Sequence, residues 1–346
     1  MPKIKVLVTG AGSGVGQSII KALNISNIKC EVISADINYL NAALYRTKKA
    51  IIVPKVESKG ALNWYLKNLK KLRINVLMVG SEFDLVFFSK NKDLIKKKTN
   101  CEVCVSNFNV VKISDDKYLT QKFLYENNLP SLKTFLPKSL KEALKFFKKL
   151  KKPFILKSRF GTSSRNVYLI NKIKDLISLF NFVDKPIMQE HIGSTTNDLK
   201  TEYTCSFFTT KDKKIIGPFI AKRKILHGTS WITEVKTNNK ISILIKKIAR
   251  LLDNTGSFNI QLRIGKRGPI PFEFNPRFSG TTSIRSHFGF NEPEMFLKSF
   301  ILKKQIKKPI IKTGVTLRYI EEVFIDKINL SKLNKGIGKG KINKWF

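Results

Sequence analysis

Strands and helices alternate along the first 105 residues, and this rhythm constrains the fold more than any other feature of the sequence. The expected elements are strands Lys3–Thr9, Glu31–Ala35, Ala50–Val53, Asn75–Val79 and Glu102–Val105, with helices Gln17–Leu23, Lys59–Leu72 and Phe83–Lys97. Such alternation predicts an open parallel α/β sheet. Ligands of these sheets bind beyond the carboxyl ends of the strands. The segment Gly80–Asp84 directly follows a strand, so we expect it near a ligand.

Glycines at positions 10, 12, 14 and 16 connect the first strand to the first helix. This arrangement places backbone N–H groups at a helix N-terminus, where they can bind an anion. The pattern is also typical of NAD-dependent short-chain dehydrogenases and sugar epimerases. In that alternative, Asp36 would bind a ribose hydroxyl. Ser106 and the pair Tyr118 and Lys122, four residues apart on one helix face, would supply the catalytic groups.

The elements after residue 115 no longer form a simple alternation of strand and helix. We expect helices 116–127, 140–150, 172–182 and 241–252, and strands 133–136, 154–157, 166–170, 186–192, 202–208, 214–222 and 257–264. Antiparallel pairing of neighbouring strands is the simplest arrangement of this part.

A loop of small residues follows the strand that ends at Lys157. The loop runs from Ser158 to Arg165 and contains glycine, threonine and serines. Such a hairpin can lie over a polyphosphate and donate backbone N–H bonds, with Lys157 as the fixed positive charge. An ordinary hairpin with a surface lysine is the plain alternative.

The stretch 270–280 carries the most specific pattern in the chain. Side chains two apart share one face of a strand, so Glu273, Asn275 and Arg277 are expected on one face. The aromatic residues Phe272, Phe274 and Phe278 are expected on the other face. A hairpin turn centred near residue 267 pairs Glu273 with Gln261, because cross-strand partners lie about 5 Å apart. Mg²⁺ prefers oxygen ligands, so this face predicts a metal–nucleotide site; a half-buried edge strand is the alternative.

Composition narrows the remaining classes of function. The net charge is +40, but the lysines are spread along the chain, with no repeat of aromatic and basic residues. A solvated surface is therefore favoured over a specific nucleic-acid interface. The four cysteines, at positions 30, 101, 104 and 205, show no disulfide framework. Cys101 and Cys104 lie in an apolar strand-like run and are expected to be buried thiols, neither zinc ligands nor redox groups. We expect no secretion signal and no membrane span, and hence a cytoplasmic protein.

From Lys3 to about Tyr319 the chain resembles the ATP-grasp superfamily. It is most similar to the branch of the carbamoyl-phosphate synthase large subunit and its stand-alone carboxylate–amine ligase relatives. The paired strands with Gln261, Glu273, Asn275 and Arg277, and the loop after Lys157, are the most specific motifs. The resemblance implies a Rossmann-like domain (1–112), an ATP-grasp fold of two α+β subdomains (113–190 and 191–325) and a basic C-terminal tail (326–346).

The resemblance also implies roles for individual residues. The residues implied to bind ATP are Lys117, Lys157, Gly161, Thr162, Ser163, Ser164, Gln189, Glu190, His191, Ile192 and Glu202. Those implied to bind Mg²⁺ or Mn²⁺ are Gln261, Glu273 and Asn275. Those implied to act on the transferring phosphate or the substrate are Arg277, Lys157, Arg223 and Arg285. Arg285 is the candidate for holding a substrate carboxylate, with a surface arginine at a helix start as the alternative.

The implied activity is that of an ATP-dependent ligase. A substrate carboxylate would take the γ-phosphate to give an acyl phosphate, and an amine would displace phosphate, leaving ADP. The partners would be a small-molecule carboxylate and amine, without specific nucleic acid or membrane, in a possible homodimer. Two departures from the family pattern concern the long loop 193–201 and the amide at Gln261, which carbamoyl-phosphate synthase-like members share.

Overall fold

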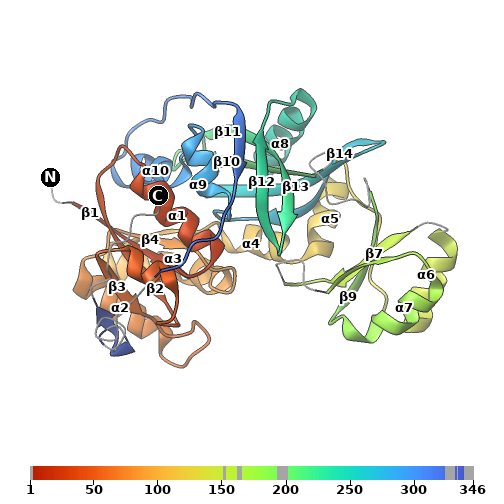
Figure 1. The fold of residues 1–346 in the computed structure, drawn as a ribbon, viewed down its shortest axis with the longest axis horizontal. Coiled ribbons are helices and arrows are strands. Elements are labelled where there is room, and N and C mark those ends of the chain that lie inside the picture. Colours follow the sequence, from red (N-terminus) through yellow and green to blue (C-terminus); the bar gives the residue numbers. More distant parts are fainter. Residues whose placement is uncertain are drawn as a thin grey trace.

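Three β-sheets organise the chain in the computed structural model. The structure describes residues 3–150, 153–161, 166–192, 202–323, 332 and 334–338. Figure 1 shows the parallel sheet at one end of the molecule and a small lobe around β7 and β9 at the other, with a central antiparallel sheet between them. This mixed architecture confirms the predicted fold class.

The first sheet is parallel apart from one short edge strand, in the order β16-β3-β2-β1-β4-β5. Its strands are β1 (Ile4–Thr9), β2 (Cys30–Asp36), β3 (Lys49–Ile52), β4 (Val76–Val79), β5 (Glu102–Cys104) and β16 (Ile337–Gly338). Its helices are α1 (Gly14–Asn24), α2 (Ala61–Leu72) and α3 (Leu85–Thr99), with a short 3₁₀ turn η1 (Ala42–Arg46). All of these except β16 and η1 were predicted from the alternation of strand and helix patterns along the sequence. The edge strand β16 comes from the predicted basic tail, for which no element was expected.

Two glycines let the first helix approach the sheet closely. A Cβ on Gly16 would lie 2.2 Å from the carbonyl oxygen of Gly10, and one on Gly80 would lie 2.3 Å from that of Thr9. Real Cβ atoms do not come this near to backbone oxygens, so only glycine fits both positions. The glycines therefore serve close backbone packing between β1, β4 and α1.

The central sheet is antiparallel, in the order β14-β13-β10-β11-β12-β15. Its strands are β10 (Glu202–Thr209), β11 (Ile215–Leu226), β12 (Thr229–Val235), β13 (Gly256–Gly265), β14 (Gly268–Asn275) and β15 (Gly314–Leu317). Helix α8 (Asn239–Leu251) packs its apolar face on one side of this sheet. The other side shares a hydrophobic core with α1 and the parallel sheet, so the two sheets are joined by continuous packing. Strands β12 and β15 were not predicted.

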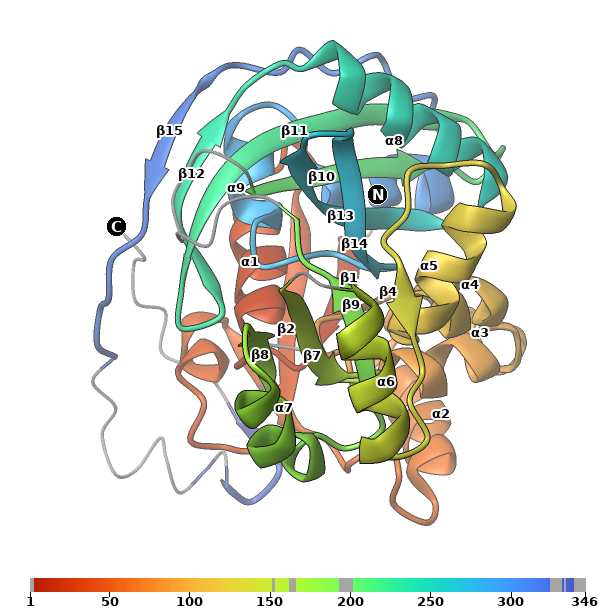
Figure 2. The same cartoon turned by 90° about the vertical axis from the view of Figure 1, so that its right-hand side faces the viewer.

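The small lobe has its own core beneath two helices. Its strands are β6 (Thr134–Phe135), β7 (Phe154–Ser158), β8 (Val167–Ile170) and β9 (Pro186–Glu190), in the order β6-β9-β7-β8. Its helices are α6 (Leu140–Leu150) and α7 (Ile173–Leu179), followed by the turn η2 (Phe180–Phe182). Figure 2 shows this lobe below the strands of the central sheet.

Short helices connect the three sheets. They are α4 (Phe108–Asp115), α5 (Lys117–Glu126), α9 (Thr282–His287), α10 (Glu292–Phe296) and a π-helical turn η3 (Leu297–Ile301). Helix α1 packs against α9 and α10, and α5 packs against β14. Helix α4 was not predicted. In the part of the chain that the structure describes, no helix is both long and apolar enough to cross a membrane.

Candidate active site

A cavity of about 440 Å³ lies between the small lobe and the central sheet, within the roughly 300–1,000 Å³ typical of small-molecule sites. The structure brings most of the predicted site residues to its wall, namely Lys117, Lys157, Gly161, Gln189, Glu190, His191, Ile192, Glu202, Arg223, Gln261 and Glu273. These residues come from seven elements and their loops, and they are up to 156 positions apart in sequence. We call it the nucleotide cavity, after the ligand that the sequence predicts for these residues.

A β-bulge sets the register of the hairpin that forms the floor of this cavity. Near the turn, Gly265 pairs with Gly268 and Leu262 pairs with Pro271. One residue further, Gln261 pairs with Glu273, so Phe272 is the extra residue of the bulge. The predicted partnership of Gln261 and Glu273 is confirmed. A two-residue turn without the bulge would have paired Gln261 with Phe272 instead.

The bulge also corrects the prediction for Phe272. Expected on the core face with Phe274, it lies instead in the wall of the nucleotide cavity, while Phe274 is buried under α8. A bulge re-aims side chains in this way because it interrupts the alternation of the strand. The ring of Phe272 lies 6.0 Å from Lys157 Nζ and 5.9 Å from the guanidinium carbon of Arg263.

Four polar side chains form a continuous chain of hydrogen bonds along the hairpin. Gln261 Nε2 and Asn275 Nδ2 each donate to Glu273 Oε1 at 3.0 Å. Arg277 in turn donates to Asn275 Oδ1 at 2.9 Å. The predicted face of Glu273, Asn275 and Arg277 is therefore present, with Gln261 as its cross-strand partner.

The three oxygen-bearing residues fit a divalent cation in type and position. Both amides lie within 3.0 Å of the same carboxylate oxygen, Glu273 Oε1. In this orientation Gln261 Oε1 accepts from Arg223 and Asn275 Oδ1 accepts from Arg277. An amide can therefore offer its oxygen to a cation only after a half-turn that releases its arginine. In the described part of the chain there is no cluster of three His, Cys, Asp or Glu that could hold a metal. With a single carboxylate, such a site suits Mg²⁺ that arrives on a nucleotide.

Lys157 places an unpaired positive charge in the nucleotide cavity. It is 7% exposed, and its ammonium has no hydrogen-bond or ion-pair partner among the residues that the structure describes. Burial, and the neighbouring charge of Lys117, lower its pKa to about 8. An ammonium in this position is stabilised by any anion that enters the cavity.

Lys117 and Arg159 fasten the base of the small-residue loop to helix α5. Lys117 Nζ donates to the carbonyl oxygen of Gly161 at 2.6 Å. Arg159 makes a bidentate pair with Asp116, whose carboxylate also caps α5. Burial lowers the pKa of Lys117. The predicted contacts Thr162, Ser163 and Ser164 lie outside the described residues, as does the loop 193–201.

Glu202 is held between two arginines. Its Oε1 accepts from Arg223 at 3.0 and 2.7 Å, and its Oε2 accepts from Arg263 at 3.0 and 2.8 Å. Burial acts to raise the pKa of Glu202, but Arg223 and Arg263 outweigh it and lower the pKa. Arg223 also donates to Gln261 at 2.6 Å. Arg263, two residues from Gln261 on β13, had no role in the predicted site.

The segment 189–192 also lines the nucleotide cavity. The side chain of Gln189 is turned away and donates to Thr134 at 3.0 Å. Glu190 bonds Arg267 at 2.7 Å and the backbone N–H of Lys133 at 3.2 Å. These bonds tie β9 to β6 and to the tip of the hairpin.

Arg285 is placed differently from both sequence predictions. It has no exposed surface, so it is neither a surface arginine nor in contact with the nucleotide cavity. Its guanidinium donates to Glu292 at 2.8 Å and to Asn259 at 2.6 Å. This buried pair supports the packing of α9 and α10 on β13. A substrate carboxylate is therefore not expected to reach Arg285.

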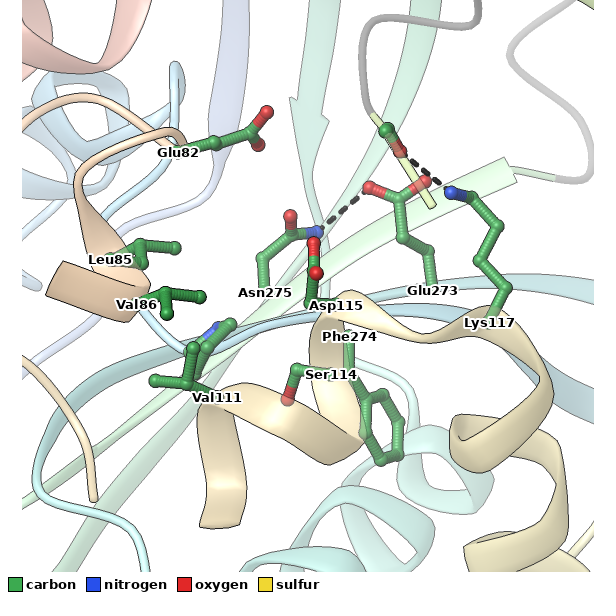
Figure 3. Close-up of a pocket in the computed structure, with 12 residues that line it drawn as sticks. Glu82, Leu85, Val86, Val111, Ser114, Asp115, Lys117, Glu273, Phe274 and Asn275 are labelled. Carbon is green, nitrogen blue, oxygen red and sulfur yellow. Dashed lines mark hydrogen bonds between the residues drawn. The ribbon is translucent and has the colours of Figure 1, made fainter. Parts of the chain in front are cut away.

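A second, smaller cavity adjoins the nucleotide cavity, and Lys117, Gly161 and Glu273 line both. Figure 3 shows Glu82 of the loop after β4, Asp115 of α4, and Glu273 and Asn275 of β14 around this cavity. Glu82, from the loop after β4, forms an ion pair with Arg277. Burial, and secondarily Arg285, lower the pKa of Arg277 to about 9, so it remains a cation at neutral pH. Burial raises the pKa of Asp115.

The structure does not support the dehydrogenase alternative. Ser106 donates to Asn254 at 2.8 Å, and Lys122 pairs with Glu126 on the surface. The proposed catalytic groups Ser106, Tyr118 and Lys122 thus have separate surroundings. Asp36, the candidate for the ribose, accepts instead from the backbone of Gly12 at 2.8 Å. Cys101 and Cys104 are buried free thiols, as predicted, while Cys205 is also buried and Cys30 is half-buried.

Comparisons with known proteins agree with this architecture. Residues 199–323 match the family described as "ATP-grasp in the biosynthetic pathway with Ter operon". A carbamoyl-phosphate synthase of Methanobrevibacter smithii is 21% identical over 283 residues, which cover 78% of this chain and 74% of that protein.

Two solved structures illustrate the shared fold. The N5-carboxyaminoimidazole synthetase of Staphylococcus aureus complexed with ADP has a TM-score of 0.73 at 16% identity, covering 92% of this chain and 83% of that chain. The biotin carboxylase domain of the Hydrogenobacter thermophilus 2-oxoglutarate carboxylase has a TM-score of 0.70 at 12% identity, covering 90% and 73%. That domain was crystallised with MgADP, ADP and bicarbonate.

Proposed function

We propose that the chain is an ATP-grasp enzyme, as the family match of residues 199–323 and the shared fold support, and that it is an ATP-dependent carboxylate–amine ligase that forms ADP. The reaction would have two steps. A substrate carboxylate takes the γ-phosphate of ATP to give an acyl phosphate, and an amine then attacks the acyl carbon and displaces phosphate.

One observation carries this proposal. Positively charged side chains lie close to the oxygen-bearing side chains of the hairpin in the nucleotide cavity. Lys117 and Lys157 face Glu273 and Gln261 across it. Two cations opposite an oxygen-ligand set suit a polyphosphate with its divalent cation. Residues 189–192, Leu132 and Ile155 also line the cavity and offer backbone groups and apolar side chains for a purine base.

We assign the nucleotide contacts accordingly. Lys117 and Lys157 would bind phosphate oxygens, together with the loop that begins at Gly161. The backbone of Gln189–Ile192 would pair with the base. The carboxylate oxygens of Glu202, which accept from Arg223 and Arg263, would also accept from the ribose hydroxyls. Thr162, Ser163 and Ser164 stay in the proposal as contacts of the triphosphate.

Gln261, Glu273 and Asn275 would hold Mg²⁺ or Mn²⁺ through their side-chain oxygens. When bound, the cation neutralises charge on the phosphates and orients them for transfer. The arginines Arg277 and Arg223 approach the same residues and would stabilise the negative charge that develops on the transferring group. No side chain is needed as a covalent nucleophile, because positioning and charge neutralisation supply the catalysis.

We assign a separate role to each part of the chain. Residues 1–112 would help to form the acceptor side, 113–190 would cover the nucleotide, and 191–325 would hold the metal and the transferring phosphate. The basic tail 326–346, a homodimer and a cytoplasmic location remain predictions. We expect a small-molecule carboxylate and amine as substrates, without specific nucleic-acid binding.

The product of nucleotide turnover tests the proposed reaction. Acyl-phosphate chemistry converts ATP to ADP and phosphate, so chromatography should show ADP in proportion to the coupled product. A panel of carboxylates with hydroxylamine as a general nucleophile provides the assay. Formation of AMP and pyrophosphate would refute the acyl-phosphate mechanism. Thermal stabilisation of the protein by NAD but not by Mg-ATP would refute the proposal that it is an ATP-dependent ligase.

Nucleotide affinity should fall at alkaline pH because of Lys157. Its pKa is lowered to about 8 in the empty cavity, and a bound polyphosphate raises it, since opposite charges favour the protonated form. Binding thus takes up a proton. The association constant for Mg-ADP should be flat below pH 8 and should fall above it, by at most about tenfold per pH unit. A titration between pH 7 and 9.5 measures this, and the same slope in Lys157→Met would contradict the assignment.

A further inference from the structure

Each amide assigned to the metal lies between one arginine and one carboxylate. The oxygen of Gln261 accepts from Arg223 at 2.6 Å, and the oxygen of Asn275 accepts from Arg277 at 2.9 Å. On its other side, each amide nitrogen donates to Glu273 Oε1 at 3.0 Å, a bond that Figure 3 shows for Asn275. The same arrangement therefore occurs twice around a single carboxylate oxygen.

These neighbours fix the orientation of both amides. A guanidinium group has only donors, and an ionised carboxylate has only acceptors. All four bonds form only if each amide oxygen faces its arginine and each amide nitrogen faces Glu273. A divalent cation at Glu273 Oε1 would then meet two N–H₂ groups in place of ligand oxygens.

The two arginines also oppose a divalent cation through their charge. Arg223 is 9% exposed and Arg277 is 8% exposed. Buried charges are screened less than exposed ones, so a divalent cation that entered alone would be repelled by both guanidinium groups. Both the hydrogen bonds and the charges therefore disfavour the cation without its nucleotide.

Each arginine has other partners that hold it near its amide. Arg223 also donates to Glu202 Oε1 at 3.0 and 2.7 Å. Arg277 donates to the carbonyl oxygen of Phe278 at 2.7 Å and pairs with Glu82. The Nε of Arg277 is buried without a hydrogen-bond partner among the residues that the structure describes. Both arginines can thus stay in place and bind a further acceptor.

We propose that Arg223 and Arg277 form a latch that keeps the oxygens of Gln261 and Asn275 away from the cation position until a polyphosphate enters. The phosphate oxygens accept the guanidinium N–H groups that the amides release. Each amide can then make a half-turn, so that its oxygen lies beside Glu273 Oε1. This rests on the proposed function, which places the phosphates and the cation at these residues.

The latch couples the binding of the two ligands. After a half-turn without phosphate, each amide N–H₂ group would face a guanidinium group, and two sets of donors would oppose each other. The nucleotide removes this conflict and so raises the affinity for the cation. By linkage, the cation raises the affinity for the nucleotide by the same factor.

Mn²⁺ binding to the full chain without nucleotide tests the latch. Electron paramagnetic resonance measures free Mn²⁺ during a titration at pH 7.5. Arg223→Met should strengthen nucleotide-free Mn²⁺ binding by about tenfold, the factor that one hydrogen bond to a charged group contributes. Arg223→Lys, which keeps the charge, should strengthen it less. If Arg223→Met binds Mn²⁺ no more tightly than the parent protein, the proposal is overturned.

Arg263→Met is the matched control for charge. Among the described residues, the guanidinium of Arg263 donates only to Glu202, the carboxylate that Arg223 also binds. Its loss removes the same charge but frees no amide. Because Arg263 is partly exposed, the Mn²⁺ affinity should change by less than about twofold. An equal rise in Arg223→Met and Arg263→Met would show an effect of charge alone and would overturn the latch.

A second measurement compares Mn²⁺ affinity with and without saturating ADP. The ratio of the two affinities should be smaller in Arg223→Met than in the parent protein, because the latch no longer opposes the cation alone. The association of Mn²⁺ with ADP in solution is the same for both proteins and cancels in this comparison. Arg277→Met, which frees Asn275, provides the same test if a thermal melt shows that Arg223→Met is unfolded.

Mg-ADP binding to the parent protein separates this inference from the proposed function. Normal Mg-ADP binding, with an unchanged affinity ratio in the folded variants, refutes the latch alone. Absence of Mg-ADP binding in the parent protein refutes the proposed function itself.

Discussion

Replacing Glu273 by glutamine is expected to lower ATP turnover by about a thousandfold while the protein stays folded. Glu273 is the one carboxylate among the three residues assigned to the metal, and both amides point at its Oε1. Glutamine has the same shape and can still accept those two bonds, but it removes the negative charge. Loss of one preorganised electrostatic group at a transferring centre typically costs about 10²–10³ in rate.

Steady-state ADP release and a thermal melt measure this prediction together. The melting temperature of Glu273→Gln should equal that of the parent within a few degrees, and the apparent Mg²⁺ requirement should rise. Glu126→Gln, the same change at an exposed position of α5, is the matched control and should be fully active. Turnover within tenfold of the parent would remove Glu273 from the metal site.

Replacing Lys157 by methionine should weaken Mg-ADP binding by about 10- to 100-fold without destabilising the protein. A hydrogen bond to a charged group contributes about 1.5–3 kcal/mol, and about 1.4 kcal/mol corresponds to tenfold in affinity. In the empty protein, however, the ammonium is buried and no described residue pairs with it. Methionine fills similar space without that desolvation cost, so the melting temperature should stay equal or rise.

Lower affinity for Mg-ADP together with an equal or higher melting temperature is the result expected if Lys157 binds phosphate. Calorimetric titration with Mg-ADP and a thermal melt of the nucleotide-free protein provide the two readings. Lys148→Met, at an exposed position of α6 in the same lobe, should change neither by a measurable amount. A variant Lys157→Met that melts well below the parent and binds Mg-ADP normally would show that Lys157 has a structural role instead.

Much of the fold around this site could be predicted from local sequence patterns. The alternation of strands and helices up to residue 105 predicted the parallel sheet, because side-chain periodicity depends only on short-range backbone geometry. The positions of Gln261, Glu273 and Asn275 followed from strand alternation and one turn. The pairing was correct, although the bulge at Phe272 and the turn at 265–268 produce it jointly. A bulge leaves no clear local signal, so the direction of Phe272 was wrong.

Local patterns could not predict which side chains form ion pairs with the charged residues of the site. Arg285 was assigned to a substrate, but α10 brings Glu292 to it in the core. Glu202 lies 61 residues from Arg263 and meets it because β10 pairs with β13 in the central sheet. Glu82 lies 195 residues from Arg277 and meets it only because the parallel sheet packs against the central one.

The sequence by itself therefore determined the elements, the hairpin pair at the floor of the nucleotide cavity and the chemical kind of each site residue. Only the tertiary structure decided which cations are paired, which are free to meet a phosphate, and where a second cavity adjoins the first. The physical reason is the range of the interactions. Backbone sterics and turn preferences act over a few residues, whereas ion pairs and cavities depend on distances between segments that meet only when the sheets pack.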